Sequence, residues 1–172
     1  KINFQKLRGQ KTKQELTSLK KAQRINEKIL HAIVGILKKR NSFGTVSEHD
    51  IVLEIHKRSL QHGCHELSFP PIVAFGAHSG IPHHQSSARR KLKKGYMILI
   101  DMGVKVHGYC ADMTRTFFTA PPSARQAKVY TAVLEAQKKA LAKMKSGAST
   151  HDIYFAAYNS FGEVAPHFTH GL

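Results

Sequence analysis

The first part of the chain alternates polar and apolar positions with the period of an α-helix. Between residues 12 and 39 the apolar positions return about every 3.6 residues, namely at Leu16, Leu19, Ala22, Ile29, Ile33, Ile36 and Leu37. Thr12 and Glu15 have the spacing of a capping box. This segment is predicted to be a long amphipathic helix with one stripe on a core. Thr45 and Glu48 repeat the spacing and predict a second helix that Gly63 ends.

The period then changes to one typical of strands. Residues 67–75 are extended in pattern but contain Pro70 and Pro71, which predicts an edge strand. A loop is predicted at 77–94. Three runs rich in β-branched and aromatic residues follow at 97–102, 106–111 and 114–118, and their short turns predict an antiparallel meander.

After Pro121 and Pro122 the helical period returns for about 22 residues. One face of this helix carries Tyr130, Val133, Leu134, Gln137, Leu141 and Met144, and Gly147 ends it. Ser149 or Thr150 is predicted to cap a further helix, which Gly162 closes. Runs of strands beside runs of helices indicate an α+β fold, with an antiparallel sheet flanked by helices.

Composition places the chain among globular proteins. Its 172 residues are typical of one domain. The content of 41% hydrophobic and 22% charged residues excludes disordered and collagen-like classes. No apolar run approaches the length of a membrane span, and the lysine-rich start lacks a signal-peptide core. The two cysteines form no CxxC pair, which favours a reducing compartment, so we expect a cytoplasmic protein without membrane association.

The net charge of +16 raises the alternative of nucleic-acid binding. Twelve of the 27 Lys and Arg residues lie in residues 1–40, against two Glu. A second basic cluster at residues 89–94 lacks the interleaved aromatic side chains that single-strand binding uses. We therefore interpret the charge as solvated surface and expect no nucleic-acid partner. Binding that weakens steeply with salt would contradict this interpretation.

Two carboxylates interrupt the predicted strands at Asp101 and Asp112. A hairpin turn centred between Val106 and His107 would place Lys105 opposite Gly108 and Asp101 opposite Asp112. Directly opposed side chains have Cβ atoms about 4.5–5.5 Å apart, and two ionised carboxylates at that distance repel. A pair of divalent ions about 3.5–4 Å apart relieves this repulsion and activates water for hydrolysis. In the alternative interpretation, Asp101 begins a turn and Asp112 pairs with Arg115.

At this point the sequence resembles the M24 metallopeptidases, which include methionine aminopeptidases and Xaa-Pro aminopeptidases and dipeptidases (prolidases). The aspartate hairpin, with the stretches DMG and GYCADMTRTFF, is similar to the Xaa-Pro branch in particular. Further similar stretches are LRGQKTKQEL at 7–16, SFPPIVAFG at 68–76, IPH at 81–83, LKKG at 92–95 and VLEAQ at 133–137. The resemblance covers essentially the whole chain and implies the pita-bread fold, here incomplete.

The resemblance implies roles for individual residues. Asp101 matches an aspartate that chelates one metal and Asp112 one that bridges two divalent ions, most often Mn²⁺, with Zn²⁺ or Co²⁺ as alternatives. His83 and His170 match histidines that orient the substrate and stabilise the tetrahedral intermediate. Phe75 is a candidate for the pocket wall, with core packing as the alternative. The implied substrate is a proline-containing peptide, and the implied assembly is a homodimer.

The resemblance also implies an organisation of the chain. Residues 1–11 match a linker from an N-terminal domain that is absent, and residues 12–172 match the first two-thirds of a catalytic domain. The remaining ligands, a histidine four residues after His170 and two glutamates, would follow Leu172. We therefore expect the chain by itself to be inactive.

Three further hypotheses concern the scaffold and the other histidines. The scaffold is a non-catalytic module that binds peptides or proteins if the ligands beyond Leu172 are lacking. Among the other histidines, His78 lies in the same loop as His83 and is within reach of the pocket. His62, Cys64 and His65 are close enough in sequence to suggest zinc, but no second cluster stands at ligand spacing.

Overall fold

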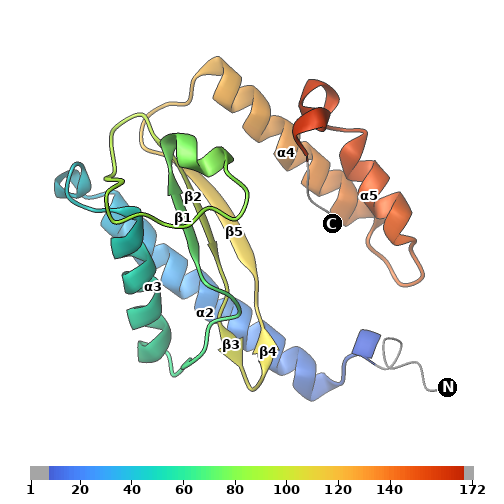
Figure 1. The fold of residues 1–172 in the computed structure, drawn as a ribbon. Coiled ribbons are helices and arrows are strands. Elements are labelled where there is room, and N and C mark those ends of the chain that lie inside the picture. The colour runs from blue at the N-terminus through green and yellow to red at the C-terminus, as the bar shows by residue number, and fades with distance from the viewer. Residues whose placement is uncertain (1–7, 169–172) are drawn as a thin grey trace. The chain divides into compact units, whose positions relative to one another are not determined.

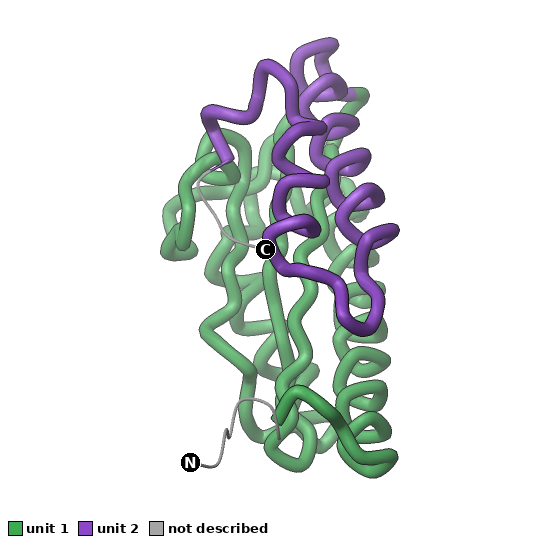
Figure 2. Tube along the Cα trace, turned by 90° about the vertical axis from the view of Figure 1, so that its right-hand side faces the viewer, with its two compact units in different colours: residues 1–121 green, residues 122–172 purple. Residues whose placement is uncertain are grey.

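The computed structural model describes residues 8–168, and these form two compact units. One unit extends to Pro121 and the other begins at Pro122, as Figure 2 shows in colour. The boundary falls at the two prolines where the sequence pattern breaks. Each unit is described by itself below.

Helix α2, Lys13–Leu37, confirms the first predicted helix. Thr12 caps its N-terminus, and Thr12 and Glu15 form the predicted capping box. Ala22, Ile29 and Ile33 on one face are fully buried. The 3.6-residue period therefore predicted both the helix and the side that it buries.

Helix α3, Glu48–Gln61, begins three residues later than the pattern predicted. Its capping box is made by Ser47 and Asp50, whereas the Thr45 hydroxyl donates to the Asn41 carbonyl after the short helix η1, Arg40–Ser42. Thr45 is thus occupied by the preceding turn. The later start places Glu48 in the first turn of α3, and its side chain is buried.

Three strands form an antiparallel sheet in the order β1-β2-β5 (Figure 1). They are β1, Ile72–Phe75, β2, Met97–Met102, and β5, Met113–Phe118. Strand β1 lies at the edge, as the two prolines before it predicted. A small hairpin of β3, Lys105–Val106, and β4, Tyr109–Cys110, connects β2 to β5. The loop predicted at 77–94 contains most of the short helix η2, Gly76–Gly80.

The core of this unit lies between the two helices and the sheet (Figure 1). It combines the buried faces of α2 and α3 with strand residues, including Ile29, Ile33, Ile51, Ile55, Val73, Ile98 and Ile100, which are at most 2% exposed. Burying one such side chain contributes about 1.5–3 kcal/mol. This packing fixes β2, which carries Asp101, and β5, which begins directly after Asp112.

The second unit contains α4, Ala124–Lys143, α5, Thr150–Tyr158, and η3, Gly162–His167. Ser123 and Gln126 cap α4, and Ser149 is the N-cap of α5. The predicted apolar face of α4 is not its buried face, because Tyr130, Val133, Leu134, Leu141 and Met144 are exposed. Instead Ala136 and Ala140 pack with Ala157 and Phe161. Small side chains allow the backbones of α4 and α5 to approach closely.

Two observations bear on the environment of the chain. No helix in residues 8–168 combines the length and apolarity that crossing a membrane requires. Cys64 is buried and Cys110 is exposed, and both are free thiols.

Candidate metal centre

Asp101 lies in β2, and Asp112 immediately precedes β5. The predicted register between them is wrong by two residues, since Asp101 pairs with Thr114 and Met102 with Met113. The turn consists of His107 and Gly108, with φ of 50° and 82°. A two-residue hairpin turn of type I′ requires positive φ at both positions, and glycine tolerates it best, so the turn includes Gly108 and excludes Val106.

The two aspartates nevertheless converge. The observed register, continued past Met102, puts Asp112 across from Gly103, which makes Asp101 its diagonal neighbour. The pKa of Asp112 is raised above its ordinary value of 3.8 by desolvation, by the negative charge of Asp101, and by a hydrogen bond to Asp101. Two carboxylates this close compete for one proton. Such a pair fits a divalent cation, which removes the repulsion.

Neighbouring groups orient this pair. The Thr114 hydroxyl donates to Oδ1 of Asp101 at 2.7 Å. The Arg115 guanidinium donates to the Thr114 carbonyl at 2.8 Å, and within residues 8–168 no ion pair joins Arg115 to Asp112. The alternative in which Asp112 pairs with Arg115 is therefore wrong.

Gly103 and Asn26 fix the backbone beside the aspartates. A Cβ on Gly103 would clash with the Ala111 carbonyl oxygen, so only glycine fits here without a shift. The buried Asn26 side chain donates to the Met102 carbonyl at 3.4 Å and accepts from the Val104 amide at 3.0 Å. Helix α2 is thereby joined to the turn after β2, which holds Asp101 in place.

The loop after η2 carries His83. Its side chain is exposed, and its φ is 52°. A positive φ is uncommon for a residue with a side chain. The next residue, His84, is half-buried and bonds to Glu48. His83 is thus held in an unusual backbone conformation beside an anchored neighbour, and its role, like the roles of Asp101 and Asp112, stays a prediction.

Two other predicted site residues have different outcomes. Phe75 is fully buried and belongs to the core cluster formed with residues of α2 and α3. A side chain with no exposed surface fits the core alternative, and its assignment to the pocket wall stays a prediction. His170 lies outside the described residues.

Sequence reasoning missed Glu48. Its Oε1 accepts from the Phe75 amide at 2.7 Å and faces Nδ1 of His78 at 2.8 Å. Its Oε2 accepts from the Ser87 amide and faces Nε2 of His84, each at 2.9 Å. Burial raises the pKa of Glu48, but these four hydrogen bonds outweigh it and lower the pKa below 4.5. An acidic residue in the first turn of a helix ordinarily indicates a favourable interaction with the helix dipole, so the pattern gave no signal.

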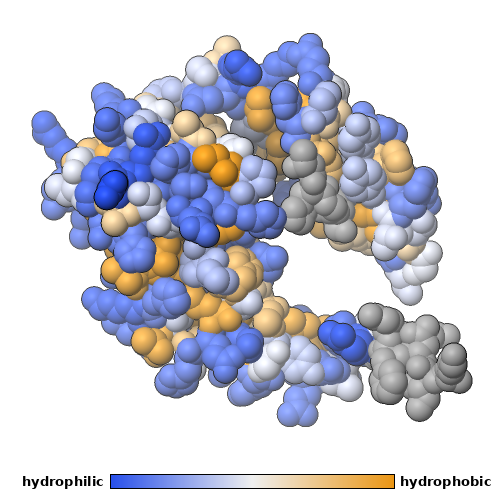
Figure 3. Space-filling model, in the orientation of Figure 1, coloured by the Kyte–Doolittle hydropathy of each residue, from blue (hydrophilic) through white to orange (hydrophobic). Residues whose placement is uncertain are grey.

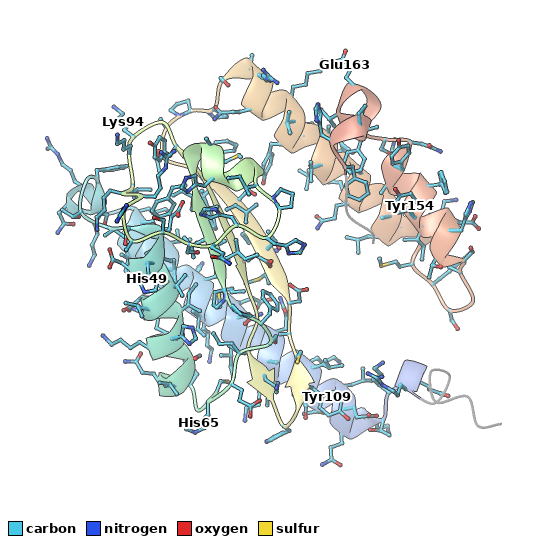
Figure 4. The ribbon with its side chains drawn as sticks, in the orientation of Figure 1. His49, His65, Lys94, Tyr109, Tyr154 and Glu163 are labelled. Carbon is cyan, nitrogen blue, oxygen red and sulfur yellow. The ribbon has the colours of Figure 1, made fainter. Side chains whose placement is uncertain are left out.

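Some basic side chains of unit 1 make contacts within the fold. Arg90 donates to the Phe75 carbonyl and stacks over the Tyr96 ring at 4.7 Å, and Lys91 pairs with Asp50 at 3.5 Å. Figure 4 labels Lys94 in this region, and Figure 3 shows the surface there as hydrophilic. These contacts support the interpretation of this cluster as a solvated face.

Comparison with known proteins places the chain among metallopeptidases. It belongs to metallopeptidase family M24, whose family model matches residues 17–172. An uncharacterized peptidase of Staphylococcus aureus (strain MRSA252) is 34% identical over 177 residues, which cover 99% of this chain and 49% of the relative. An uncharacterized peptidase of Staphylococcus saprophyticus is 36% identical over 172 residues, 96% of this chain and 47% of the relative. The chain spans about half the length of these curated relatives.

Solved structures give the fold. A prolidase from Thermococcus sibiricus matches with a TM-score of 0.85 and 33% identity over 93% of this chain and 43% of that one. An Xaa-Pro dipeptidase from Bacillus anthracis matches with a TM-score of 0.88 and 28% identity over 96% of this chain and 46% of that one. The predicted fold is confirmed: the chain is α+β and forms part of a pita-bread domain.

Proposed function

We propose that the protein hydrolyses the peptide bond between an N-terminal residue and a following proline, with water activated at a dinuclear metal centre. The family supports metal-dependent peptidase activity. The structural similarity to prolidases and to an X-Pro aminopeptidase from Thermotoga maritima supports the Xaa-Pro bond. The observation that carries the proposal is that Asp101 in β2 and Asp112 just before β5 are diagonal neighbours, close enough for the charge of Asp101 to raise the pKa of Asp112.

Within this chain, Asp101 and Asp112 are the residues that would hold the metal. Oxygen donors suit Mn²⁺, with Zn²⁺ or Co²⁺ as alternatives. Divalent ions, when bound, supply a Lewis acid and lower the pKa of water. Thr114 orients the Asp101 carboxylate through its hydroxyl, and Gly103 and Asn26 fix the backbone beside it.

Other residues of the chain would act on the peptide. His83, exposed in its loop, would orient the substrate and donate to the oxygen that becomes negative during hydrolysis. Losing one such donor costs about 100–1,000-fold in rate. His170 is proposed for the same task. The proline-containing peptide is the proposed substrate.

The wider context is also a proposal. We propose residues 1–11 as a linker and residues 12–172 as part of the catalytic domain. A homodimer is proposed from the resemblance alone. The free thiols Cys64 and Cys110 support a cytoplasmic, reducing location.

The decisive variant is Asp112→Asn, made in a protein that also contains the ligands expected after Leu172. It keeps the shape of the side chain but removes the charge that would bind metal, so we expect Mn²⁺-dependent cleavage of an Xaa-Pro peptide to fall to background. The assay measures release of the N-terminal residue, and Mn²⁺ binding is followed by the loss of the free-ion electron paramagnetic resonance signal.

The matched control is Asp152→Asn, because Asp152 is an exposed carboxylate of the second unit that the proposed site does not use. It should retain wild-type activity. Full activity in Asp112→Asn would refute the dinuclear centre. A wild type that neither binds Mn²⁺ nor cleaves the peptide would favour the non-catalytic binding module.

A further inference from the structure

Three potential ligand atoms converge on one point away from the aspartates. They belong to Glu48 at the start of α3, His78 in η2 and His84 in the loop after it, and all lie within 4.8 Å of one another. The two imidazole rings are 4.3 Å apart between centroids. The histidines are 30 and 36 positions from Glu48 in sequence, so the fold alone brings the three residues together.

The Glu48 carboxylate faces two imidazole nitrogens, and each of these contacts requires a proton or a cation. Each Glu48 oxygen accepts one backbone N–H, from Phe75 or Ser87, and also faces an imidazole nitrogen, at 2.8 Å for His78 and 2.9 Å for His84. A bare imidazole nitrogen this close to a carboxylate oxygen is repulsive, so a proton or a cation must lie between them. Two N–H protons satisfy this requirement, and so does one metal ion.

We propose that Glu48, His78 and His84 form a second metal site, suited to Zn²⁺. Two imidazoles and one glutamate are a known zinc donor set that leaves one position for water. Imidazole suits transition metals rather than Mg²⁺ or Ca²⁺. The site shares no residue with the function proposed above and does not depend on it.

The surroundings are those of a supported metal site. Hydrogen bonds from the Phe75 and Ser87 amides fix the orientation of the Glu48 carboxylate, as outer-shell partners of metal ligands do. Glu48 is fully buried, while the His84 and His78 side chains are 9% and 29% exposed, which gives the ion a path of entry from the His78 side. Ligand atoms of a tetrahedral zinc ion stand about 3.3 Å apart, and the three ligand atoms here lie within 4.8 Å of one another.

Binding here would join α3 to the loop of residues 76–87. That loop carries His83, whose strained backbone stands directly before the ligand His84. The ion would therefore have a structural role: it would hold the loop against α3 without contacting a substrate.

The test uses the 172-residue chain with Asp101→Asn and Asp112→Asn as the reference, so that the aspartate pair binds no metal. Co²⁺ is titrated while visible absorption is recorded, and Zn²⁺ is titrated by calorimetry. We expect one tightly bound ion with the absorption of tetrahedral nitrogen and oxygen coordination. We also expect the thermal midpoint of unfolding to rise with Zn²⁺, since a ligand of the native state stabilises it.

Adding His78→Ala should weaken binding by more than about 100-fold, the upper end of the effect of an outer-shell partner, and should abolish the Zn²⁺-dependent rise. The matched control is His49→Ala, because His49 follows Glu48 in α3, is exposed (Figure 4) and has no place in the site. His78 is partly exposed on a short helix, so its loss leaves the core intact. His84→Ala and Glu48→Gln repeat the test at the buried ligands.

Two results would overturn the proposal. One is the absence of Co²⁺ and Zn²⁺ binding by the reference chain. The other is binding that His78→Ala leaves unchanged or that His49→Ala weakens equally. Either result would mean that the metal binds to surface histidines only. In either case the cluster is a hydrogen-bonded contact between α3 and the loop.

Discussion

Asp112 and Glu48 are both carboxylates of the first unit, yet their pKa values shift in opposite directions. The Asp112 pKa is raised, by desolvation and by the adjacent Asp101. The Glu48 pKa is lowered although it is the more deeply buried side chain, because donors surround it. The comparison shows that four hydrogen bonds together outweigh burial at Glu48, whereas at Asp112 a neighbouring negative charge adds to the effect of burial.

The two arrangements have different consequences. The aspartate pair is held in a repulsive state by the strands, which leaves it ready to bind a cation. Glu48 is satisfied by protein donors and supports the fold even without an ion. The first arrangement costs stability, whereas the second contributes to it.

The largest effect is expected for Glu48→Ala. It leaves two backbone amides and two imidazoles without their acceptor, and breaking such a buried network costs about 3–5 kcal/mol. Urea denaturation measures the free energy of unfolding. The matched control is Glu54→Ala in the same helix, which loses a partly exposed pair with Arg58 and should cost about 1 kcal/mol or less. Equal losses in the two variants would show that the protein does not depend on Glu48.

Gly103→Ala should have the next largest effect. The added Cβ would clash with the Ala111 carbonyl oxygen, so the strands must separate, at a cost of about 1–3 kcal/mol. Separation also moves Asp112 from Asp101, so the Asp112 pKa should fall back toward 3.8 in an NMR titration.

Gly35→Ala is the control for Gly103→Ala. Nothing lies within 4 Å of the Cβ that it would add, and alanine favours a helix, so the variant should gain about 0.5–1 kcal/mol in the same urea experiment. A Gly103→Ala protein with wild-type stability would contradict the close approach of the strands.

A smaller effect is expected for Asp112→Asn without metal. Because the folded pKa of Asp112 lies above 3.8, stability from this group falls as pH rises from 3.8 through the raised value. Removing the charge should therefore stabilise the metal-free protein near neutral pH, by less than about 1 kcal/mol because solvent screens the pair. Urea denaturation across pH in the presence of a chelator measures it, and a destabilised variant would contradict the repulsion.

Glu48→Gln tests a pKa shift in the opposite direction. The lowered pKa of Glu48 means that its stabilisation is fully present above 4.5 and is lost as pH falls through the folded pKa. Glu48→Gln should therefore be less stable than the wild type near neutral pH, whereas Asp112→Asn should be more stable, and both differences should shrink on acidification. If both variants changed the free energy of unfolding in the same direction, the opposite pKa shifts of Asp112 and Glu48 would be contradicted.

Much of the fold was predictable from local pattern. The 3.6-residue period and the Thr12 and Glu15 spacing indicated α2, because helix signals act over a few residues. The paired prolines indicated the edge position of β1. The ordered set of short stretches around Asp101 and Asp112 indicated the family.

The sequence alone determined where most helices and strands form and which two aspartates lie near one another, since these depend on neighbours along the chain. Only the tertiary structure decided the hairpin register, where His107 and Gly108 adopt positive φ, and the surroundings of Glu48. The backbone donors to Glu48 come from positions 27 and 39 residues away. A contact between distant residues depends on how the elements pack, and local periodicity does not indicate it.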